Sequence, residues 1–259
     1  MMERLLRAHV LLIYAFMYLP VAVITIFSFN DSEMIAFPLQ GFTLAWYADV
    51  LSDSRILGGL GTTLTIAVPT ALLATLLGGL SALALARYRF RWKLIFAILL
   101  LVPFLIPRII FAVSQLLVLS ELNIERSVAT IVAAQMLIIL PFTALIITSV
   151  LIRLDGRLEE AAADLGASSW QIFRRVQLPL MRNGLIAAAF IALVLSSGEY
   201  VVTAFLSGRV QPLSVMIASD FRFSLSPSLN ALAALTVLAN VVVIVVSETF
   251  RWRGRRTAG

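Results

Sequence analysis

Long apolar runs alternate with short polar segments along the chain. Six of these runs are long enough, at about 20 residues, to cross a hydrocarbon core about 30 Å thick. They lie near residues 8–28, 62–86, 94–119, 128–151, 184–206 and 230–250. A bilayer admits only structures that satisfy their own backbone hydrogen bonds. The pattern therefore predicts an all-α membrane protein with six transmembrane helices, in a single transmembrane domain over residues 1–259.

Prolines and glycines modify these predicted helices. Pro103 and Pro107 predict the strongest kinks, because proline removes a backbone donor from a helix and its ring crowds the preceding turn. Glycines that flank and enter the second run, namely Gly58, Gly59, Gly61, Gly78 and Gly79, predict close approach to neighbouring helices. They do not form a phosphate-binding loop, because no lysine follows them and no strand precedes them.

Composition narrows the class of protein. The chain is 61% hydrophobic and 13% charged, whereas charged residues make up about a quarter of a soluble domain. Because there is no cysteine and one histidine, His9, the sequence predicts neither a thiol nucleophile nor a metal site. We interpret the first apolar run as a retained helix and not a secretory signal, because Pro20 interrupts it and no small-residue cleavage site follows.

Basic residues are concentrated on one side of the predicted helices. Fifteen of the 20 lysines and arginines lie in the two termini, in the turn 87–93 and in the segment 152–183, whereas four lie in the opposite loops. Basic residues near helix ends stay in the cytoplasm. We therefore expect the N-terminus, the C-terminus and the loop at about 152–183 to be cytoplasmic, and the loop at about 29–60 to lie outside. The positive charge reflects this topology, and no nucleic-acid partner is expected.

The segment 152–183 carries the signals of a bent pair of helices. In chain order these are a capping aspartate, acidic residues in a first turn, a terminating glycine, a capping box and a proline: Asp155, Glu159, Glu160, Gly166, Ser168 with Gln171, and Pro179. They predict one helix that ends at the glycine and a second that ends before the proline. From the residues alone, such a pair either docks into a groove of another protein or braces helix ends.

The spacing within this segment is that of a known motif. It runs Glu-Ala-Ala, a glycine after three residues, then a β-branched residue and Leu-Pro: Glu160, Ala161, Ala162, Gly166, Val176, Leu178 and Pro179. This resembles the EAA motif of membrane permeases of binding-protein-dependent ABC importers, with valine in place of isoleucine. The segments 28–51, 86–93 and 198–208 are similar to permeases of the spermidine/putrescine group of that family.

The resemblance implies a fold, a location and partners. It implies the type I ABC importer permease fold in the bacterial inner membrane, with the seven motif residues seated on cytoplasmic ATPase subunits. ATP and Mg are expected on that separate ATPase, since the chain lacks a phosphate-binding loop with its lysine, and the chain itself is not expected to be an enzyme or to bind a cofactor. A second, related permease subunit and an extracytoplasmic solute-binding protein are the other expected partners, and a homodimer stays open.

Four polar residues lie at membrane depth in the predicted helices: Arg108, Gln135, Glu199 and Asn240. Such residues are candidates for a solute pathway, because charged and polar groups are costly in lipid. Arg108 and Glu199 fall at a common depth of roughly 21–23 Å along continuous helices. They predict either an internal ion pair or contacts with solute. Polyamine-group permeases often have an acidic residue where this chain has Arg108, so an amino-acid derivative, an opine or a phosphonate stays open beside a polyamine.

Two other classes of protein compete with the importer hypothesis. A stand-alone, ion-coupled secondary transporter predicts inverted halves and unwound helices at an ion site, and it gives the helix pair of 152–183 no purpose. An intramembrane enzyme requires a nucleophile, a base or a metal at membrane depth, and the sequence offers no thiol, histidine or ligand cluster there. The sequence therefore favours a transport subunit that moves a small organic solute by alternating access.

Overall fold

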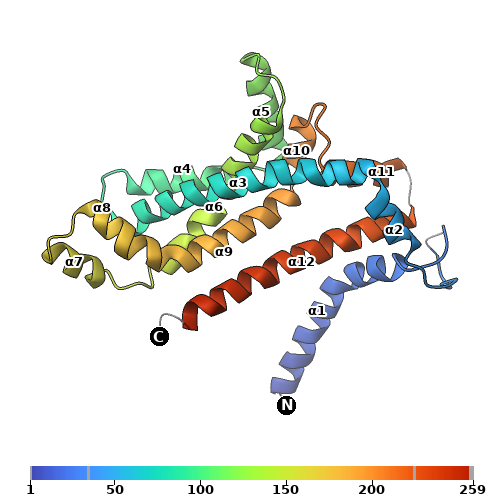
Figure 1. The fold of residues 1–259 in the computed structure, drawn as a ribbon, viewed down its shortest axis with the longest axis horizontal. Coiled ribbons are helices and arrows are strands. Elements are labelled where there is room, and N and C mark those ends of the chain that lie inside the picture. The colour runs from blue at the N-terminus through green and yellow to red at the C-terminus, as the bar shows by residue number, and fades with distance from the viewer. Residues whose placement is uncertain (1, 34–35, 224–225, 257–259) are drawn as a thin grey trace. The chain divides into compact units, whose positions relative to one another are not determined.

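The structure is a computed structural model that describes residues 2–33, 36–223 and 226–256 (Figure 1). The described residues are helical apart from turns, loops and one isolated β-bridge between Asn30 and Phe42. The helices are α1 (Met2–Phe27), α2 (Ala45–Ser52), α3 (Ser54–Arg87), α4 (Lys93–Leu105), α5 (Arg108–Glu121), α6 (Val128–Leu151), α7 (Arg157–Asp164), α8 (Ser169–Ile172), the π-helical turn η1 (Phe173–Gln177), α9 (Leu178–Ser197), α10 (Val201–Leu206), α11 (Leu213–Phe223) and α12 (Pro227–Arg256).

Five of the six predicted spans overlap a helix that is long and apolar enough to cross a membrane. The third run is different, because α4 and α5 meet at an angle of 101° and form at most one broken span. In Figure 1, α5 turns sharply away from α4. The bend lies at Ile106 and Pro107, whose extended backbone conformations separate the two helices. The kink predicted at Pro107 is confirmed, whereas Pro103 lies within α4.

The fifth predicted run is also interrupted. Residues 184–206 were expected to form one helix, but α9 ends at Ser197 and α10 begins at Val201. The intervening residues include Gly198, which is the C-cap of α9, and Glu199, whose side chain accepts a hydrogen bond from the first turn of α10. This side-chain bond takes the place of a backbone bond that a continuous helix would need. The end of α9 therefore could not be predicted from the apolar composition of residues 184–206 alone.

The chain divides into two compact units, Met1–Leu60 with Met216–Val241 and Gly61–Val215 with Val242–Gly259. In the second unit, α6 packs along α9 and α4, and α10 packs on α5 and α6. Ile131 and Ile138 of α6 are buried with Phe111 of α5 and with Val202 and Leu206 of α10. This apolar cluster holds the broken spans around α6 and so positions the polar residues described below.

Close helix packing is confirmed at one of the predicted glycines. A Cβ atom on Gly78 would lie 2.2 Å from Thr143 Oγ1 and 2.9 Å from the backbone nitrogen of Ala144 on α6. Thr143 Oγ1 donates a hydrogen bond to the carbonyl of Ala74 at 2.7 Å. Gly61, in contrast, has open space where a Cβ would be. The approach of α3 to α6 therefore depends on Gly78.

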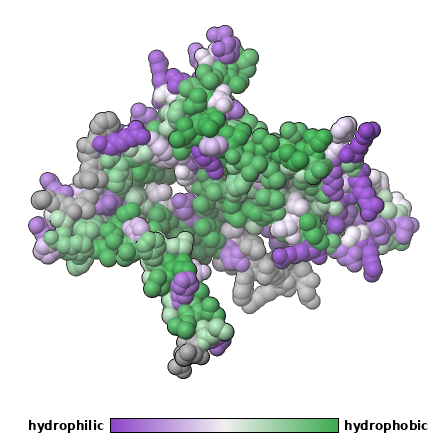
Figure 2. All heavy atoms as spheres, turned by 180° about the vertical axis from the view of Figure 1, so that it is seen from behind, coloured by the Kyte–Doolittle hydropathy of each residue, from purple (hydrophilic) through white to green (hydrophobic). Residues whose placement is uncertain are grey.

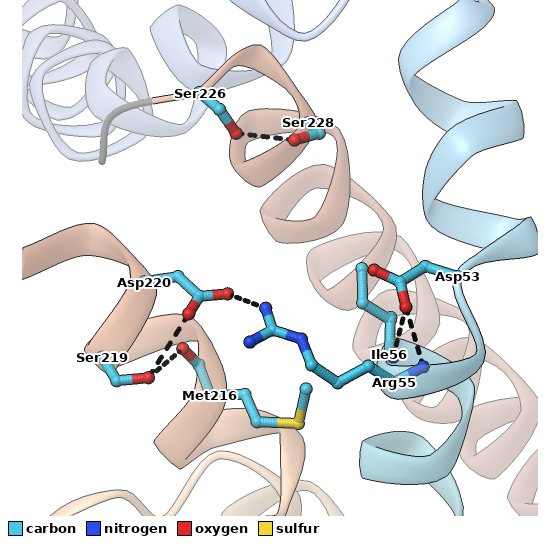
Figure 3. A network of polar contacts seen from close by, with 8 residues as sticks. All are labelled: Asp53, Arg55, Ile56, Met216, Ser219, Asp220, Ser226 and Ser228. Atoms are coloured by element: carbon cyan, nitrogen blue, oxygen red, sulfur yellow. Dashed lines mark hydrogen bonds and ion pairs between the residues drawn. The ribbon is translucent and has the colours of Figure 1, made fainter. Parts of the chain in front are cut away.

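In the first unit, the start of α3 is fixed by local polar contacts (Figure 3). Asp53 Oδ1 accepts hydrogen bonds from the backbone N–H groups of Arg55 at 2.7 Å and Ile56 at 3.4 Å, and so caps the first turn. The guanidinium of Arg55 pairs with the carboxylate of Asp220 on α11. Figure 3 shows these groups turned toward one another beside Ser226 and Ser228, which share a hydrogen bond of 2.6 Å.

The surface carries extensive apolar areas. Figure 2 shows hydrophobic side chains along the helices and polar side chains gathered around α7 and α8. Exposed leucine, isoleucine and phenylalanine side chains occur along α1, α3, α4, α5 and α12. Such apolar faces are expected of helices that contact lipid or neighbouring membrane subunits.

Candidate functional site

The polar segment between α6 and α9 forms the bent helix pair that its sequence predicts. Asp155 Oδ1 accepts the N–H of Arg157 at 3.0 Å where α7 begins. Gly166 follows α7 with φ at +83°, in the left-handed region that glycine enters at little cost. Ser168 and Gln171 form the predicted capping box, in which Ser168 N–H donates to Gln171 Oε1 at 2.8 Å and Gln171 N–H donates to Ser168 Oγ at 3.4 Å.

The end of the second helix was predicted wrongly. Instead of ending before Pro179, α8 continues through the π-helical turn η1 into α9, so that Ser169–Ser197 is one helical segment. The N–H of Leu178 donates to the carbonyl of Phe173, five residues earlier. The wider π turn before α9 leaves room for the ring of Pro179, which in a regular α-helix would clash with the carbonyl four residues earlier. The second arm of the pair is therefore continuous with a predicted span.

Most of the seven motif residues are accessible. Glu160, Ala161, Gly166, Leu178 and Pro179 are exposed, whereas Ala162 and Val176 are half-buried. A cleft of about 350 Å³ between the arms is lined by Ala162, Leu165, Gly166, Ala167, Gln171, Ile172, Arg175 and Val176. The structure thus brings Ala162, Gly166 and Val176 to one cleft. Leu165, which also lines the cleft, is 89% exposed and leaves its apolar side chain accessible there.

One polar cluster in this segment was missed in the sequence. Glu159 Oε1 lies 2.8 Å from Nε of Arg87, the last residue of α3, and Glu159 Oε2 accepts a hydrogen bond of 2.8 Å from Gln177 Nε2. Arg87 Nη2 also donates to the carbonyl of Leu154 at 3.1 Å. The sequence alone indicated only that Glu159 is an acidic residue in the first turn of a helix and that Arg87 is one of several basic residues at a helix end. The only hint was that a glutamate adjoins the motif glutamate Glu160.

A second polar cluster joins the two interruptions in the predicted spans. Arg108 is the first residue of α5, and its Nη1 lies 2.5 Å from Oε2 of Glu199. The other carboxylate oxygen of Glu199 accepts the N–H of Val202 at 3.0 Å. The Glu199 side chain is 12% exposed and the Arg108 side chain is 39% exposed. The structure contains the internal ion pair, and contact of these residues with solute stays a prediction.

Gln135 of α6 forms hydrogen bonds to both α9 and α10, on either side of the interruption between these two helices. Its Nε2 donates to Thr203 Oγ1 of α10 at 2.8 Å, and its Oε1 accepts a hydrogen bond from Ser196 Oγ of α9. Thr203 Oγ1 in turn donates to the carbonyl of Glu199 at 2.7 Å. With 1% of its surface exposed, Gln135 has internal partners at both ends of its amide. Asn240 is half-buried on α12, and its place in a pathway stays a prediction.

Comparison with known proteins identifies the family. Residues 74–251 match the family of the binding-protein-dependent transport system inner membrane component. The chain belongs to this family. The permease is 35% identical over 250 residues to the spermidine/putrescine transport system permease protein PotC of Escherichia coli (strain K12), with 96% of this chain and 94% of that protein covered. It is 33% identical over 241 residues to the putrescine transport system permease protein PotI of the same strain, with 90% and 85% covered.

Solved structures have a similar fold at lower sequence identity. The permease matches a bacterial ABC transporter involved in the import of the acidic polysaccharide alginate with a TM-score of 0.70 and 17% identity, over 96% of each chain. It matches an amino acid ABC transporter with a TM-score of 0.61 and 17% identity, over 82% of this chain and 100% of the other. At these identities the comparison concerns the fold alone.

The family determines the general role of the chain. It is a multi-pass inner-membrane permease subunit of a binding-protein-dependent ABC importer, as its motif predicted. It is a non-catalytic subunit, because in this family the ATPase is a separate subunit. The interpretation as an importer permease is thereby confirmed over the secondary transporter and the intramembrane enzyme.

Proposed function

We propose that this permease imports a polyamine of the putrescine and spermidine type. The observation that carries the proposal is the likeness, over nearly the full length, to two permeases named for these solutes. Polyamines are cationic, so the charges along the solute pathway must tolerate positive groups. We propose Arg108, Gln135, Glu199 and Asn240 as residues of that pathway.

The pairing of Arg108 supports this solute class. An arginine in the pathway of a cationic solute would repel it if its charge were unbalanced. Here the guanidinium contacts the Glu199 carboxylate at 2.5 Å, so its charge is already balanced. A polyamine ammonium group can also replace the guanidinium at Glu199, because both are cationic donors that a carboxylate accepts.

A second candidate rests on the unequal exposure of the same pair. The Arg108 side chain is 39% exposed and that of Glu199 is 12% exposed, so the cationic partner is the more accessible one. An accessible guanidinium suits a carboxylate or phosphonate group. A zwitterionic or anionic solute, such as an amino-acid derivative, an opine or a phosphonate, is therefore the alternative.

The motion is proposed to come from ATPase subunits beneath the loop 152–183. We assign the contact to Glu160, Ala161, Ala162, Gly166, Val176, Leu178 and Pro179, with ATP and Mg held by the ATPase. The cleft between the arms supports this assignment, because its lining is largely apolar, includes the exposed Leu165, and suits a segment of a protein partner. This assignment requires both termini to be cytoplasmic, in agreement with the basic residues at 87–93 and 152–183.

The proposed assembly contains two permeases and an external solute-binding protein. We infer a second, related permease as the partner, with a homodimer as the alternative. Closure of the ATPases on ATP would favour the outward-facing state by binding one conformation of the loop better than the other. The permease supplies the path and the coupling surface.

Uptake by the purified assembly tests the solute class. The permease is isolated from its native membranes with its partners, reconstituted in vesicles with ATP, and supplied with labelled putrescine, spermidine or 2-aminoethylphosphonate. ATP-dependent uptake of a polyamine, with no uptake of the phosphonate, is expected. Uptake of the phosphonate without either polyamine would replace the polyamine by the second candidate.

A further inference from the structure

The contacts of Glu159 use both of its carboxylate oxygens to join three parts of the chain. Oε1 lies 2.8 Å from Arg87 Nε at the end of α3, and Oε2 accepts from Gln177 Nε2 in η1 at 2.8 Å. The same arginine donates through Nη2 to the carbonyl of Leu154, in the turn before α7, at 3.1 Å. We call Arg87, Leu154, Glu159 and Gln177 the loop brace. It ties α7 to α3 and to the start of the α9 segment.

The loop brace is sheltered enough to hold its geometry. The side chains of Arg87 and Glu159 are 15% and 17% exposed, and Gln177 is buried. Screening by salt is weaker for such an ion pair than for an exposed one. The hydrogen bond from Gln177 to the Glu159 carboxylate is charge-assisted and therefore stronger than a neutral one. An apolar cluster that contains Leu83, Leu151 and Met181, with Leu154 packed against it, lies at the same ends of α3, α6 and α9. The brace therefore joins polar groups of elements that already pack together.

The two arms of the helix pair are connected to the spans in different ways. The second arm is continuous with α9, because Ser169–Ser197 is one helical segment. The first arm, α7, joins α6 through the residues 152–156, which are turn and loop. Flexible connections transmit displacement poorly, so α7 needs non-covalent contacts to move a span with it. The ion pair of Glu159 with Arg87 supplies such a contact to α3.

We propose that Arg87 is a positioning residue that fixes α7 to the end of α3, so that motion received at the motif moves α3 together with α9. The inference rests on the proposed contact of the motif with an ATPase. Glu160 faces the partner in this arrangement, whereas its neighbour Glu159 faces the permease. Loss of the brace is expected to leave the ATPase bound but to let α7 move without α3.

Spin labels measure whether α3 and α7 move together. The chain has no cysteine, so Leu80→Cys on α3 and Ala163→Cys on α7, both at exposed positions, introduce one label pair. Pulsed electron paramagnetic resonance then gives the distance distribution in the assembly, with and without ATP and vanadate. The cysteine-free permease with the same partners provides the background. The matched control is Arg89→Ala, which removes an exposed arginine two residues beyond Arg87.

We expect one narrow distance that ATP does not change in the unaltered permease and in Arg89→Ala. In Arg87→Ala the distance distribution should broaden and shift with ATP. The putrescine imported per ATP hydrolysed should fall roughly 5- to 20-fold, which is at the lower end of the coupling usually found between sites. The charge-reversed pair Arg87→Glu with Glu159→Arg should recover a narrow distance, because it restores the ion pair without the original residues.

Three results would overturn the proposed role of Arg87 in the loop brace. They are an unchanged distribution in Arg87→Ala, the same broadening in Arg89→Ala, and a charge-reversed pair no better than Arg87→Ala. Failure of the ATPase to co-purify with the unaltered permease would instead overturn the proposed contact at the motif. The distance measurement does not depend on the solute, so an error in the solute class leaves it interpretable.

Discussion

Arg108 and Glu199 meet where two predicted spans are interrupted, with Nη1 of Arg108 2.5 Å from Oε2 of Glu199. One interruption is the 101° bend between α4 and α5, and the other separates α9 from α10. Glu199 also accepts the N–H of Val202 and thereby begins α10. The pair consequently joins two half-helices, and its removal affects both their packing and the charge of the candidate pathway.

The first prediction separates these two effects by a double-mutant cycle. Arg108→Ala should lower the free energy of unfolding of the purified permease by about 1–3 kcal/mol, because it leaves the largely buried carboxylate of Glu199 without its ion-pair partner. Arg108→Ala with Glu199→Gln should recover most of that stability. Uptake decides the role in transport. If the double variant also recovers uptake, the pair is internal only; if it does not, the residues contact solute.

The second prediction concerns Gln135. Gln135→Leu should destabilise the permease by about 1–3 kcal/mol, because the buried hydroxyl of Ser196 loses its acceptor and that of Thr203, which still donates to the Glu199 carbonyl, loses the amide donor. Adding Ser196→Ala and Thr203→Val should restore part of this loss, since an apolar set of similar shape leaves fewer groups unsatisfied. Thermal unfolding in detergent measures both variants. A Gln135→Leu variant as stable as the unaltered chain would show that the amide does not fasten α9 to α10.

The local structure of the helix pair could be predicted from the sequence, and the breaks in the spans could not. Asp155, Gly166 and the capping box of Ser168 act within a few residues, so their signals are readable without the fold. Hydropathy indicates which residues lie in lipid, but it does not show where a helix bends or ends within an apolar run. The depth of Arg108 and Glu199 was accordingly estimated along unbroken helices, although both residues lie at interruptions.

The loop brace was unpredictable for another reason. Arg87 and Glu159 are far apart in the chain, and each has a sufficient local explanation, since arginine suits a helix end and glutamate suits a first turn. Only the packing of α3 against the ends of α6 and α9 brings them together. The continuation of α8 through Pro179 was missed similarly, because proline ordinarily ends a helix and a π turn has no clear sequence signal.

The third prediction tests the contact of α3 with α6. Gly78→Ala should destabilise the permease by about 1–3 kcal/mol, because the added Cβ would lie 2.2 Å from Thr143 Oγ1 and 2.9 Å from the Ala144 backbone. Gly61→Ala is the matched control on the same helix, where nothing lies within 4 Å of the added atom. It should cause no loss, because alanine favours helix. Equal destabilisation by both substitutions would attribute the effect to glycine itself and not to close packing.

The fourth prediction locates the ATPase contact. In Glu160→Lys the exposed carboxylate of the motif becomes a cation, while α7 keeps its start at Asp155 and its end at Gly166. Reversing a charge at an interface costs several kcal/mol through like-charge contact with the partner, on the order of a hundredfold or more in affinity. We expect an ATPase to co-purify with the unaltered permease from gently solubilised membranes and to be lost in Glu160→Lys, as judged by mass spectrometry.

The control for this experiment is Glu121→Lys, which reverses an exposed glutamate at the end of α5, in a loop predicted to face outward. It makes the same change in net charge and should retain the ATPase. If Glu160→Lys retains the ATPase as well, while both variants are inserted and expressed equally, the contact does not depend on the motif glutamate. If both variants lose it, net charge and not the position of Glu160 governs assembly, and the cleft beside Leu165 would no longer be the preferred docking surface.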